Sequence, residues 1–387
     1  MIKYPLIHDT WTENEIQAIN SVIKSNRFSM GPNVAEFESN FAKMFGSKYA
    51  ICVNSGSSAN LLAISALFFY KNGLKKGDEI IVPAVGWSTT YSPLFYLGLR
   101  PVFVDIDKNT LNIDIAKIEA AISKKTKAIF TVNLLGKSSV NNSLIKLCKK
   151  YKIHLIEDNC ESMGARYESK YCGTFGLAGT FSFFFSHHIT TIEGGMVLTD
   201  SKEFYDISKS IRAHGWLREL DDKSHLFDKN VSEFRRMFWF VLPGFNIRPT
   251  EFTGAIGLAQ LGKFKKFVKI RKENHAYFHS KIRNNPIFYT QSNDAGHSAF
   301  TFPFILKKPN KLLLSKIIKL LTKNGIECRP IASGDITRQP LIKYFEKPKG
   351  LKNPNALYMD DYGFMVGNHP IRMNEKIDYL FEILSRV

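Results

Sequence analysis

The chain has 387 residues, 44% of them hydrophobic, and a formal net charge of +18 at pH 7. This length and composition predict a soluble globular protein with one large domain, residues 1–260, and one smaller domain, residues 261–387. Lysines spread over expected helices and loops supply most of the charge, and no base-reading motif accompanies them, so we expect no nucleic-acid partner. The chain lacks an apolar signal region at its start and any apolar run long enough to span a bilayer, which predicts a cytoplasmic protein without membrane contact.

Five cysteines are scattered through the chain, an odd number without paired spacing. This distribution argues against a disulfide framework and favours a reducing compartment. They are Cys52, Cys148, Cys160, Cys172 and Cys328.

Apolar runs and helical patterns alternate between about residues 50 and 200. This alternation predicts an α/β fold with helices on both faces of a sheet. The expected strands are 80–83, 102–105, 128–132, 154–157, 180–185 and 196–199, and the expected helices include 59–70, 113–123 and 142–151.

The second half of the chain begins with an irregular stretch at 212–248, where aromatic and charged residues are mixed. A loop this long in a compact protein is usually functional or lies at a subunit interface. An apolar helix at 254–261 is expected to lead into a long basic helix that ends near Arg283. Residues 289–387 alternate between strand and helix patterns and form most of the expected smaller domain.

The segment Asn54-Ser-Gly-Ser-Ser-Ala-Asn60 stands at the start of an expected helix. Gly56 permits a tight turn there, and the amides that follow, including those of Ser57 and Ser58, would attract an anion together with the helix dipole. The segment is therefore a candidate phosphate site, although a simple helix cap accounts for the same residues.

Two expected strands are followed by side chains that suit an aromatic ligand. Asp158 stands at the carboxyl end of the strand 154–157, where it could pair with a protonated pyridine nitrogen or merely cap a loop. Trp87 follows the strand 80–83 and could stack on a ring or simply pack.

Three further polar residues could bind a phosphate. Ser182 lies on the expected strand 180–185 and offers a hydroxyl. Asn246 and Arg248 offer an amide and a fixed cation, and the planar fork of arginine suits phosphate oxygens. A structured turn before a helix is the alternative for the last two.

The segment 181–195 is the most informative part of the sequence about the chemistry of the protein. An apolar strand runs into a polar turn, and Glu-Gly-Gly then leads into a second apolar run. His187 and His188 lie in the turn, and no lysine occurs between Lys170 and Lys202. Because histidine transfers protons near neutral pH, the turn is a candidate site of proton transfer.

Taken in order, these segments resemble the DegT/DnrJ/EryC1/StrS sugar aminotransferases along nearly the full chain. The likeness extends to motifs at 159–164, 211–216, 241–244 and 325–330. It implies the aspartate aminotransferase-like fold (fold type I), with a mostly parallel sheet in the large domain and a smaller C-terminal α+β domain. It also implies pyridoxal 5'-phosphate (PLP) or its amine form, pyridoxamine 5'-phosphate (PMP), as cofactor, and a homodimer with a shared active site.

The resemblance also implies roles for individual residues. Asp158 would bind the pyridine nitrogen, Trp87 would stack on the ring, and Glu161 would lie near the ring hydroxyl, where the family usually has glutamine. The phosphate would be held by Gly56, Ser57, Ser58 and Ser182, joined by Asn246 from the second subunit. The candidate substrate contacts are Arg218, Arg248 and Arg329, and no metal is expected.

His187 stands where the aminotransferases of the family have the lysine that binds the cofactor covalently. Without that lysine, the cofactor is expected to be held noncovalently, and the resemblance implies a dehydration. L-Glutamate would convert PLP to PMP, and His187 would act in removing the C3 hydroxyl of a GDP-linked 4-keto-6-deoxy sugar, with release of ammonia. The product would be destined for a surface polysaccharide.

Three alternatives were compared with this interpretation. An ordinary sugar aminotransferase would need a lysine at position 187. Iron–sulfur 3-dehydratases hold their cluster through cysteines in the second half of the chain, and here only Cys328 lies beyond Cys172, so no cluster is expected. A non-catalytic homologue that binds a sugar nucleotide or the cofactor stays open, and release of ammonia from a 4-keto sugar nucleotide would distinguish it.

Overall fold

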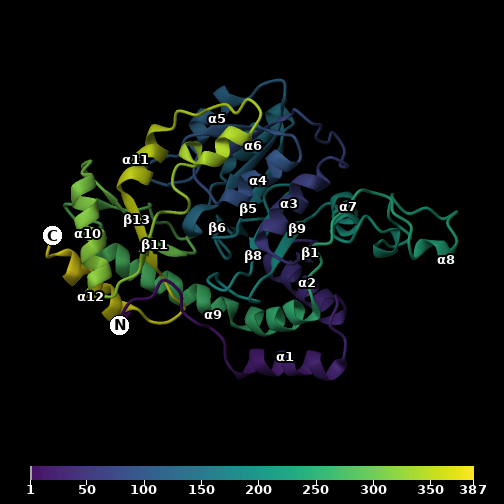
Figure 1. Ribbon diagram of the computed structural model, residues 1–387, viewed down its shortest axis with the longest axis horizontal. Coiled ribbons are helices and arrows are strands. Elements are labelled where there is room, and N and C mark those ends of the chain that lie inside the picture. Colours follow the sequence, from purple (N-terminus) through teal and green to yellow (C-terminus); the bar gives the residue numbers. More distant parts are fainter. Residues whose placement is uncertain (1) are drawn as a thin grey trace.

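The computed structural model describes residues 2–387 and contains two main sheets connected by one long helix (Figure 1). The larger sheet has seven strands in the order β1-β9-β8-β5-β4-β2-β3. The strands from β8 to β3 run parallel, whereas β9 pairs antiparallel with both β1 and β8. The bounds are β1 (Tyr49–Val53), β2 (Glu79–Pro83), β3 (Arg100–Val104), β4 (Thr126–Val132), β5 (His154–Asp158), β8 (Ala178–Ser182) and β9 (Gly195–Thr199).

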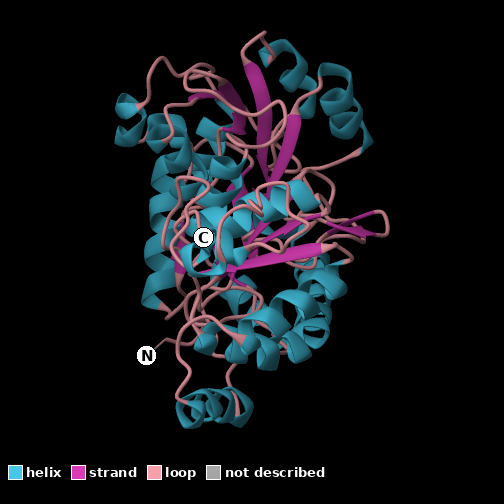
Figure 2. Ribbon diagram, turned by 90° about the vertical axis from the view of Figure 1, so that its right-hand side faces the viewer, coloured by secondary structure: helices cyan, strands magenta, loops and turns pink. Residues whose placement is uncertain are grey.

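Both faces of this sheet are buried, which explains why its strands are apolar runs in the sequence. Val82 packs among the helices of one face, and its neighbour Ile81 packs among those of the other. One face carries α3 (Gly56–Ala66), α4 (Ser88–Tyr96) and α7 (Lys202–Arg212); the other carries α2 (Pro32–Phe45), α5 (Ile115–Ala121), α6 (Asn142–Tyr151) and part of α9 (Glu251–Ile282). Figure 2 shows helices flanking the strands. The predicted α/β architecture is confirmed.

One predicted strand is shorter in the structure than the sequence indicated. The run at 180–185 leaves the sheet after Ser182, and Phe184 and Phe185 are exposed by 42% and 37%. Because these two aromatic side chains do not pack in the core, apolar character alone overestimated the strand. The turn that carries His187 therefore begins earlier than expected.

The C-terminal part forms a second core around a four-stranded antiparallel sheet in the order β10-β11-β13-β12. This confirms the smaller α+β part that the resemblance implied. Its strands are β10 (Phe288–Tyr289), β11 (Thr301–Leu306), β12 (Cys328–Arg329) and β13 (Gly363–Gly367), and its helices are α10 (Lys311–Lys323), α11 (Pro354–Tyr362) and α12 (Asn374–Leu384).

Helix α9 is continuous over 32 residues and contacts elements of both parts. The predicted domain boundary after residue 260 falls inside it and stays a prediction. The start of the chain joins the second core, where the Tyr4 hydroxyl donates to the carbonyl of Gly367 at 2.7 Å. No local pattern of the sequence indicated this contact. Helix α1 (Glu13–Ser25) then packs against α9.

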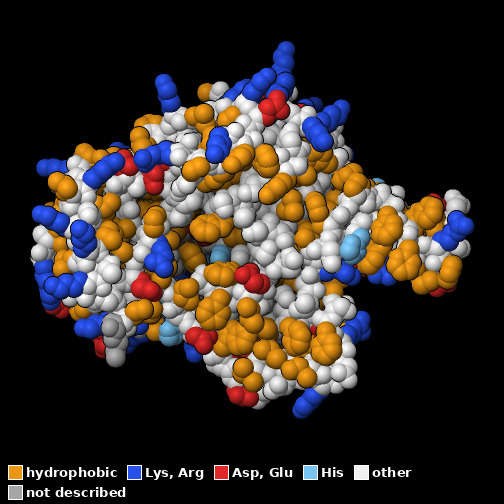
Figure 3. All heavy atoms as spheres, viewed as in Figure 1, with side chains coloured by type: hydrophobic (Ala, Val, Ile, Leu, Met, Phe, Trp, Pro, Cys, Tyr) orange, Lys and Arg blue, Asp and Glu red, His pale blue; other side chains and the backbone are white. Residues whose placement is uncertain are grey.

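The irregular stretch after α7 extends away from the body of the molecule, at the right of Figure 1. It contains only short helices, including η2 (Leu217–Glu219) and α8 (Glu233–Arg236). Phe234 is 80% exposed and Phe238 is 70% exposed, and Figure 3 shows apolar side chains gathered along this arm. We call residues 217–245 the arm. No helix within residues 2–387 is long and apolar enough to cross a membrane.

The remaining short elements are the hairpin of β6 (Arg166–Tyr167) and β7 (Lys170–Tyr171) and the 3-10 helices η1 (Leu134–Gly136), η3 (Ile336–Arg338) and η4 (Pro340–Tyr344).

Candidate active site

A cavity of about 710 Å³ lies between the carboxyl ends of β5 and β8 and the small sheet. Polar side chains from both parts of the chain line it. Among the residues predicted for chemistry, the cavity brings together Gly56, Ser57, Trp87, Asp158, Glu161, Ser182, His187 and Arg329. The position agrees with the tendency of ligands to bind beyond the carboxyl ends of parallel strands.

The amino end of α3 forms one wall. Ser55 caps the helix, and its Oγ accepts a hydrogen bond from the amide of Ser58 at 3.1 Å. The amide of Ser58 is therefore already engaged, whereas Ser57 lines the cavity and donates its hydroxyl to Thr89 at 3.1 Å. The helix cap that the sequence offered as an alternative for this segment is therefore present, at Ser55.

Glycine is required at position 56 because the side chain of Ser182 lies very close to its backbone. A Cβ placed there would lie 2.5 Å from the Cβ and 2.9 Å from the Oγ of Ser182. Glycine thus lets the end of α3 and the end of β8 meet without a side chain between them. The two hydroxyls of Ser57 and Ser182 and the start of the helix form a small polar recess that suits a phosphate group.

Asp158 ends β5 and is 4% exposed. Its Oδ2 accepts hydrogen bonds from Asn60 Nδ2 at 2.9 Å and Thr90 Oγ1 at 2.7 Å, and its Oδ1 accepts from the amide of Cys160 at 3.1 Å. These donors fix the carboxylate, which lines the cavity. Sequence reasoning missed Asn60 and Thr90; Asn60 lies one helical turn after Gly56, which was the only local signal.

Glu161 lies beside Asp158 and accepts a hydrogen bond at Oε2 from the amide of Leu135 at 3.2 Å. Leu135 has φ of 55°, a left-handed conformation in which its amide meets this carboxylate. Burial, followed by the charge of Asp158, raises the pKa of Glu161 to about 7.

The imidazole of His187 is held by a single polar contact. Its Nδ1 lies 2.7 Å from the carbonyl oxygen of Cys160, and its ring packs against that of Phe300 with centroids 5.2 Å apart. Because a carbonyl oxygen only accepts hydrogen bonds, Nδ1 carries the proton and Nε2 keeps its lone pair. Burial lowers the pKa of His187 to about 4. The imidazole is therefore neutral near pH 7, whereas at the ordinary pKa of histidine both forms would be populated.

His188 lies apart from the cavity. It is completely buried, and its Nε2 lies 3.1 Å from the carbonyl oxygen of Ser298. It therefore packs the turn against the C-terminal part.

The cations that line the cavity within residues 2–387 are arginines and not lysines, namely Arg271 and Arg329. The turn between β8 and β9 thus presents an imidazole with no amine nearby. A covalent link between a lysine and an aldehyde cofactor cannot form at such a site.

Three predicted residues lie outside this cavity, at the base of the arm. The guanidinium of Arg218 stacks 3.5 Å from the ring centroid of Trp216, and that of Arg248 lies 5.3 Å from it. Arg248 Nε donates to Asn246 Oδ1 at 3.0 Å. Asn246 and Arg218 are exposed, so within one chain they contribute nothing to the cavity walls.

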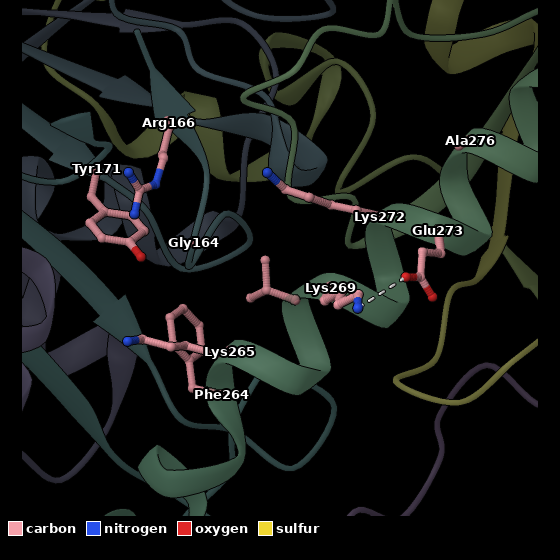
Figure 4. Close-up of a pocket in the computed structure, with 10 residues that line it drawn as sticks. Gly164, Arg166, Tyr171, Phe264, Lys265, Lys269, Lys272, Glu273 and Ala276 are labelled. Carbon is pink, nitrogen blue, oxygen red and sulfur yellow. Dashed lines mark ion pairs between the residues drawn. The ribbon is translucent and has the colours of Figure 1, made fainter. Parts of the chain in front are cut away.

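A shallower groove of about 450 Å³ runs along α9 (Figure 4). Arg166, stacked 3.8 Å from the ring centroid of Tyr171, borders it opposite Lys272. Lys269 and Glu273 form an ion pair of 3.9 Å at its edge. None of the residues predicted to act in chemistry lines this groove. The larger cavity is therefore the candidate active site.

The larger cavity fits a phosphorylated pyridine. The recess at Gly56 matches a phosphate, Asp158 offers a fixed carboxylate for a ring nitrogen, and Trp87 offers an aromatic face, being 57% exposed. The donor set is that of a PLP site except for the lysine.

Comparison with known proteins agrees with these features. Residues 9–385 match the DegT/DnrJ/EryC1/StrS aminotransferase family. The chain is 50% identical over 388 residues to a "GDP-4-keto-6-deoxy-D-mannose 3-dehydratase" of Escherichia coli O55:H7, with all of both chains covered. A solved structure of the E. coli GDP-4-keto-6-deoxy-D-mannose-3-dehydratase with bound hydrated PLP superimposes with a TM-score of 0.96 at 50% identity, over 99% of this chain and 100% of that one.

A second solved structure, of a GDP-4-keto-6-deoxymannose-3-dehydratase with a trapped PLP–glutamate geminal diamine, has a TM-score of 0.95 at 49% identity. It covers 99% of this chain, and all of that chain is matched. The family match extends over almost the whole chain and the fold agrees throughout. The chain therefore belongs to the DegT/DnrJ/EryC1/StrS aminotransferase family.

Proposed function

We propose that this protein is a PLP- and PMP-dependent 3-dehydratase that removes the C3 hydroxyl of a GDP-linked 4-keto-6-deoxy sugar. The substrate we propose is GDP-4-keto-6-deoxy-D-mannose, with L-glutamate as amino donor and ammonia as a product. The observation that carries the proposal is a cavity built for PLP in which His187 replaces the lysine. The 50% identity to a protein of that name over the full chain supports it.

The cofactor would be held by residues of both walls. Asp158 would take the ring nitrogen, Trp87 would cover the ring, and Gly56, Ser57 and Ser182 would surround the phosphate. Ser58 would support this site indirectly by closing the cap with Ser55. Glu161 would lie near the ring hydroxyl. When bound, the cofactor supplies an amine for the 4-keto group and a ring that accepts electrons.

His187 would move the protons. With Nδ1 fixed on the carbonyl of Cys160, Nε2 is the atom that removes a proton and then delivers it to the departing hydroxyl. The low pKa of the enclosed imidazole favours the proton-accepting form at the start. The negative charge of a bound phosphate would raise that pKa, so that the protonated form is also populated during turnover.

We also propose a homodimer with shared active sites. Asn246, Arg248 and Arg218 cluster outside the cavity of their own chain, at the base of the exposed apolar arm. In a second copy they would complete the phosphate and substrate contacts, while Arg329 would contribute from within the same chain. Light scattering is expected to give a dimer, and Phe238→Asp is expected to shift it towards the monomer and weaken PLP binding. A monomeric wild type with full PLP affinity would contradict this assembly.

The proposed domain boundary near residue 260 and the cytoplasmic location complete the assignment. Two separate groups of buried apolar residues, one around the large sheet and one around the small sheet, support the division. A sugar nucleotide made inside the cell supports the location.

The decisive experiment incubates the purified protein with PLP, L-glutamate and GDP-4-keto-6-deoxymannose. We expect a product lighter by one oxygen atom, together with ammonia and 2-oxoglutarate. An amino sugar would instead identify an aminotransferase. Absence of any reaction would favour a non-catalytic binding protein.

The first variant to test is His187→Asn. We expect it to bind PLP as the wild type does, because no contact to the phosphate recess or to Asp158 is lost. Turnover should fall by roughly 10²- to 10⁴-fold, the usual contribution of a general acid–base group. Near-normal turnover would show that another group moves the proton.

A further inference from the structure

Arg271 is a buried cation that the proposed mechanism does not use. It belongs to α9, is 3% exposed and lines the candidate active site. Its Nη1 donates to the carbonyl of Phe300 at 3.1 Å and to the carbonyl of Asn368. Its Nε has no hydrogen-bond partner within residues 2–387. Two backbone dipoles therefore hold one edge of the guanidinium, and the Nε edge is left without a partner.

No carboxylate compensates this charge. Burial alone lowers the pKa of Arg271 to about 9, and no neighbouring acid of the described residues raises it. Arginine remains protonated at neutral pH even so. A buried cation without an anion is costly to the folded protein, which points to a ligand that supplies the missing charge.

Two imidazoles line the cavity together with Arg271. His369, 1% exposed, and His8 line the same end of the cavity, and their rings stack with centroids 5.6 Å apart. Burial lowers the pKa of His369 to about 3, and the charges of Arg271 and Lys376 lower it further, against a small opposing contribution from the Leu6 backbone. Burial lowers the pKa of His8 as well; the charges of Lys376 and Arg271 add to this shift, and that of Asp9 opposes it. An anion bound here would meet the Arg271 cation and the His369 ring, neither nitrogen of which has a hydrogen-bond partner within residues 2–387.

This end of the cavity adjoins the site of proton transfer. Arg271 bonds the backbone of Phe300, and the Phe300 ring packs against His187. The charge of Arg271 contributes to the lowered pKa of His187. One residue therefore separates the unpaired cation from the imidazole.

We propose that Arg271, with His369 and His8, forms a carboxylate subsite that binds one carboxylate of the amino donor L-glutamate. The subsite rests on the function proposed above. The amine of glutamate must react beside His187, and its α-carboxylate is attached to the carbon next to that amine. A single unpartnered guanidinium edge matches one carboxylate, because the Nε and Nη2 protons form a fork. A diphosphate carries more charge than one such edge can balance, so a single carboxylate is the better match.

The test measures binding of glutarate, a dicarboxylate without an amine, by calorimetry on the PLP-loaded enzyme and on the cofactor-free protein. Arg271→Gln and Arg271→Lys are expected to weaken binding about tenfold or more, because both remove the charge-assisted fork of the guanidinium. Arg338→Gln is the matched control, because Arg338 lies on the surface and pairs with Asp360 and Asp361. Unchanged glutarate binding in both Arg271 variants would overturn the proposal.

Binding of GDP is measured in parallel and should not change. Loss of GDP binding with normal glutarate binding would assign the cation to the substrate diphosphate and overturn the carboxylate subsite. If Arg271→Gln fails to fold, Arg271→Lys and His369→Gln are titrated with glutarate instead. Normal glutarate affinity in both of these variants would also overturn the proposal.

Supplying PMP separates this subsite from the dehydration itself. With PMP added directly, the Arg271 variants should lose less dehydration activity than they lose with PLP and glutamate, because only the second assay needs the carboxylate subsite. With PLP and glutamate, their KM for glutamate should rise by about tenfold or more. Equal losses in both assays would show a structural role instead. A wild type that fails to dehydrate with PMP would refute the proposed function, whereas the glutarate titration would still decide the subsite.

Discussion

Two buried arginines of this protein have opposite surroundings. Arg212, at the end of α7, is 2% exposed and pairs with Glu38 at 2.6 Å and Glu219 at 3.7 Å. These carboxylates raise its pKa despite burial. Arg271 is similarly buried, but within residues 2–387 it donates only to backbone carbonyls, and burial lowers its pKa. In the body of the protein, carboxylates of the chain neutralise the charge of Arg212. At the cavity wall, the charge of Arg271 is left for a ligand to neutralise.

The largest expected effect comes from replacing each of these two arginines and comparing the free energies of unfolding. Arg212→Met would leave Glu38 without its cation, and we expect the free energy of unfolding to fall by about 3–5 kcal/mol. Arg271→Met removes an uncompensated charge along with its hydrogen bonds, so the loss should be smaller, about 1–2 kcal/mol. Urea unfolding of the two variants without ligands provides the measurement. Equal losses would show that Arg271 is also neutralised by the fold.

Glu161 is a buried acid at the cavity wall, and it can be compared with Arg271 as a charge that the chain does not neutralise. Because its pKa is raised from 4.5 to about 7 in the folded protein, folding favours its protonated form. The stability of the cofactor-free protein should therefore fall as the pH rises through that interval. Glu161→Gln removes this dependence, and we expect it to be more stable than the wild type by about 1–2 kcal/mol at pH 8, allowing for water in the cavity.

The check on Glu161 is urea unfolding of both proteins at pH 4.5 and pH 8. Near the lower pH the two should be close to equal in stability. A constant difference between them at both pH values would mean that Glu161 does not titrate in this range.

The smallest expected effect on stability distinguishes Ser55 from Ser57, the two serines at the amino end of α3. Ser55→Ala removes the helix cap and should cost about 1 kcal/mol of stability. Ser57→Ala removes only the contact with Thr89, so stability should hardly change while PLP binding weakens. Thermal unfolding and a PLP titration of both variants test this division. The reverse pattern would exchange their roles.

Much of the candidate site was visible along the chain because its residues follow buried strands. Asp158, Ser182 and His187 were recognised from apolar runs that end in polar turns, and the cavity brings them together. Their roles toward a cofactor stay predictions. The partners that fix Asp158 were missed, because Asn60 and Thr90 lie on two different helices, 98 and 68 residues away along the chain.

Arg271 was also missed, although its position carried a local signal. It lies on a buried stripe of α9 with Phe264, Phe267 and Phe278, at the spacing of one helix face. The many lysines of that helix suggested a solvated surface instead. A charged residue within an apolar stripe of a helix was the signal in the sequence that pointed to a buried arginine.

Local patterns were enough to predict the alternation of strands and helices, the family resemblance and the histidine at the position of the lysine, because burial periodicity and short motifs are local properties of the chain. Three-dimensional contacts were needed to show which nitrogen of His187 is protonated, how the Leu135 amide reaches Glu161, and that Arg271 has no acid beside it within residues 2–387. Each of these depends on contacts between distant segments, which packing of the two parts around α9 creates and local patterns do not encode.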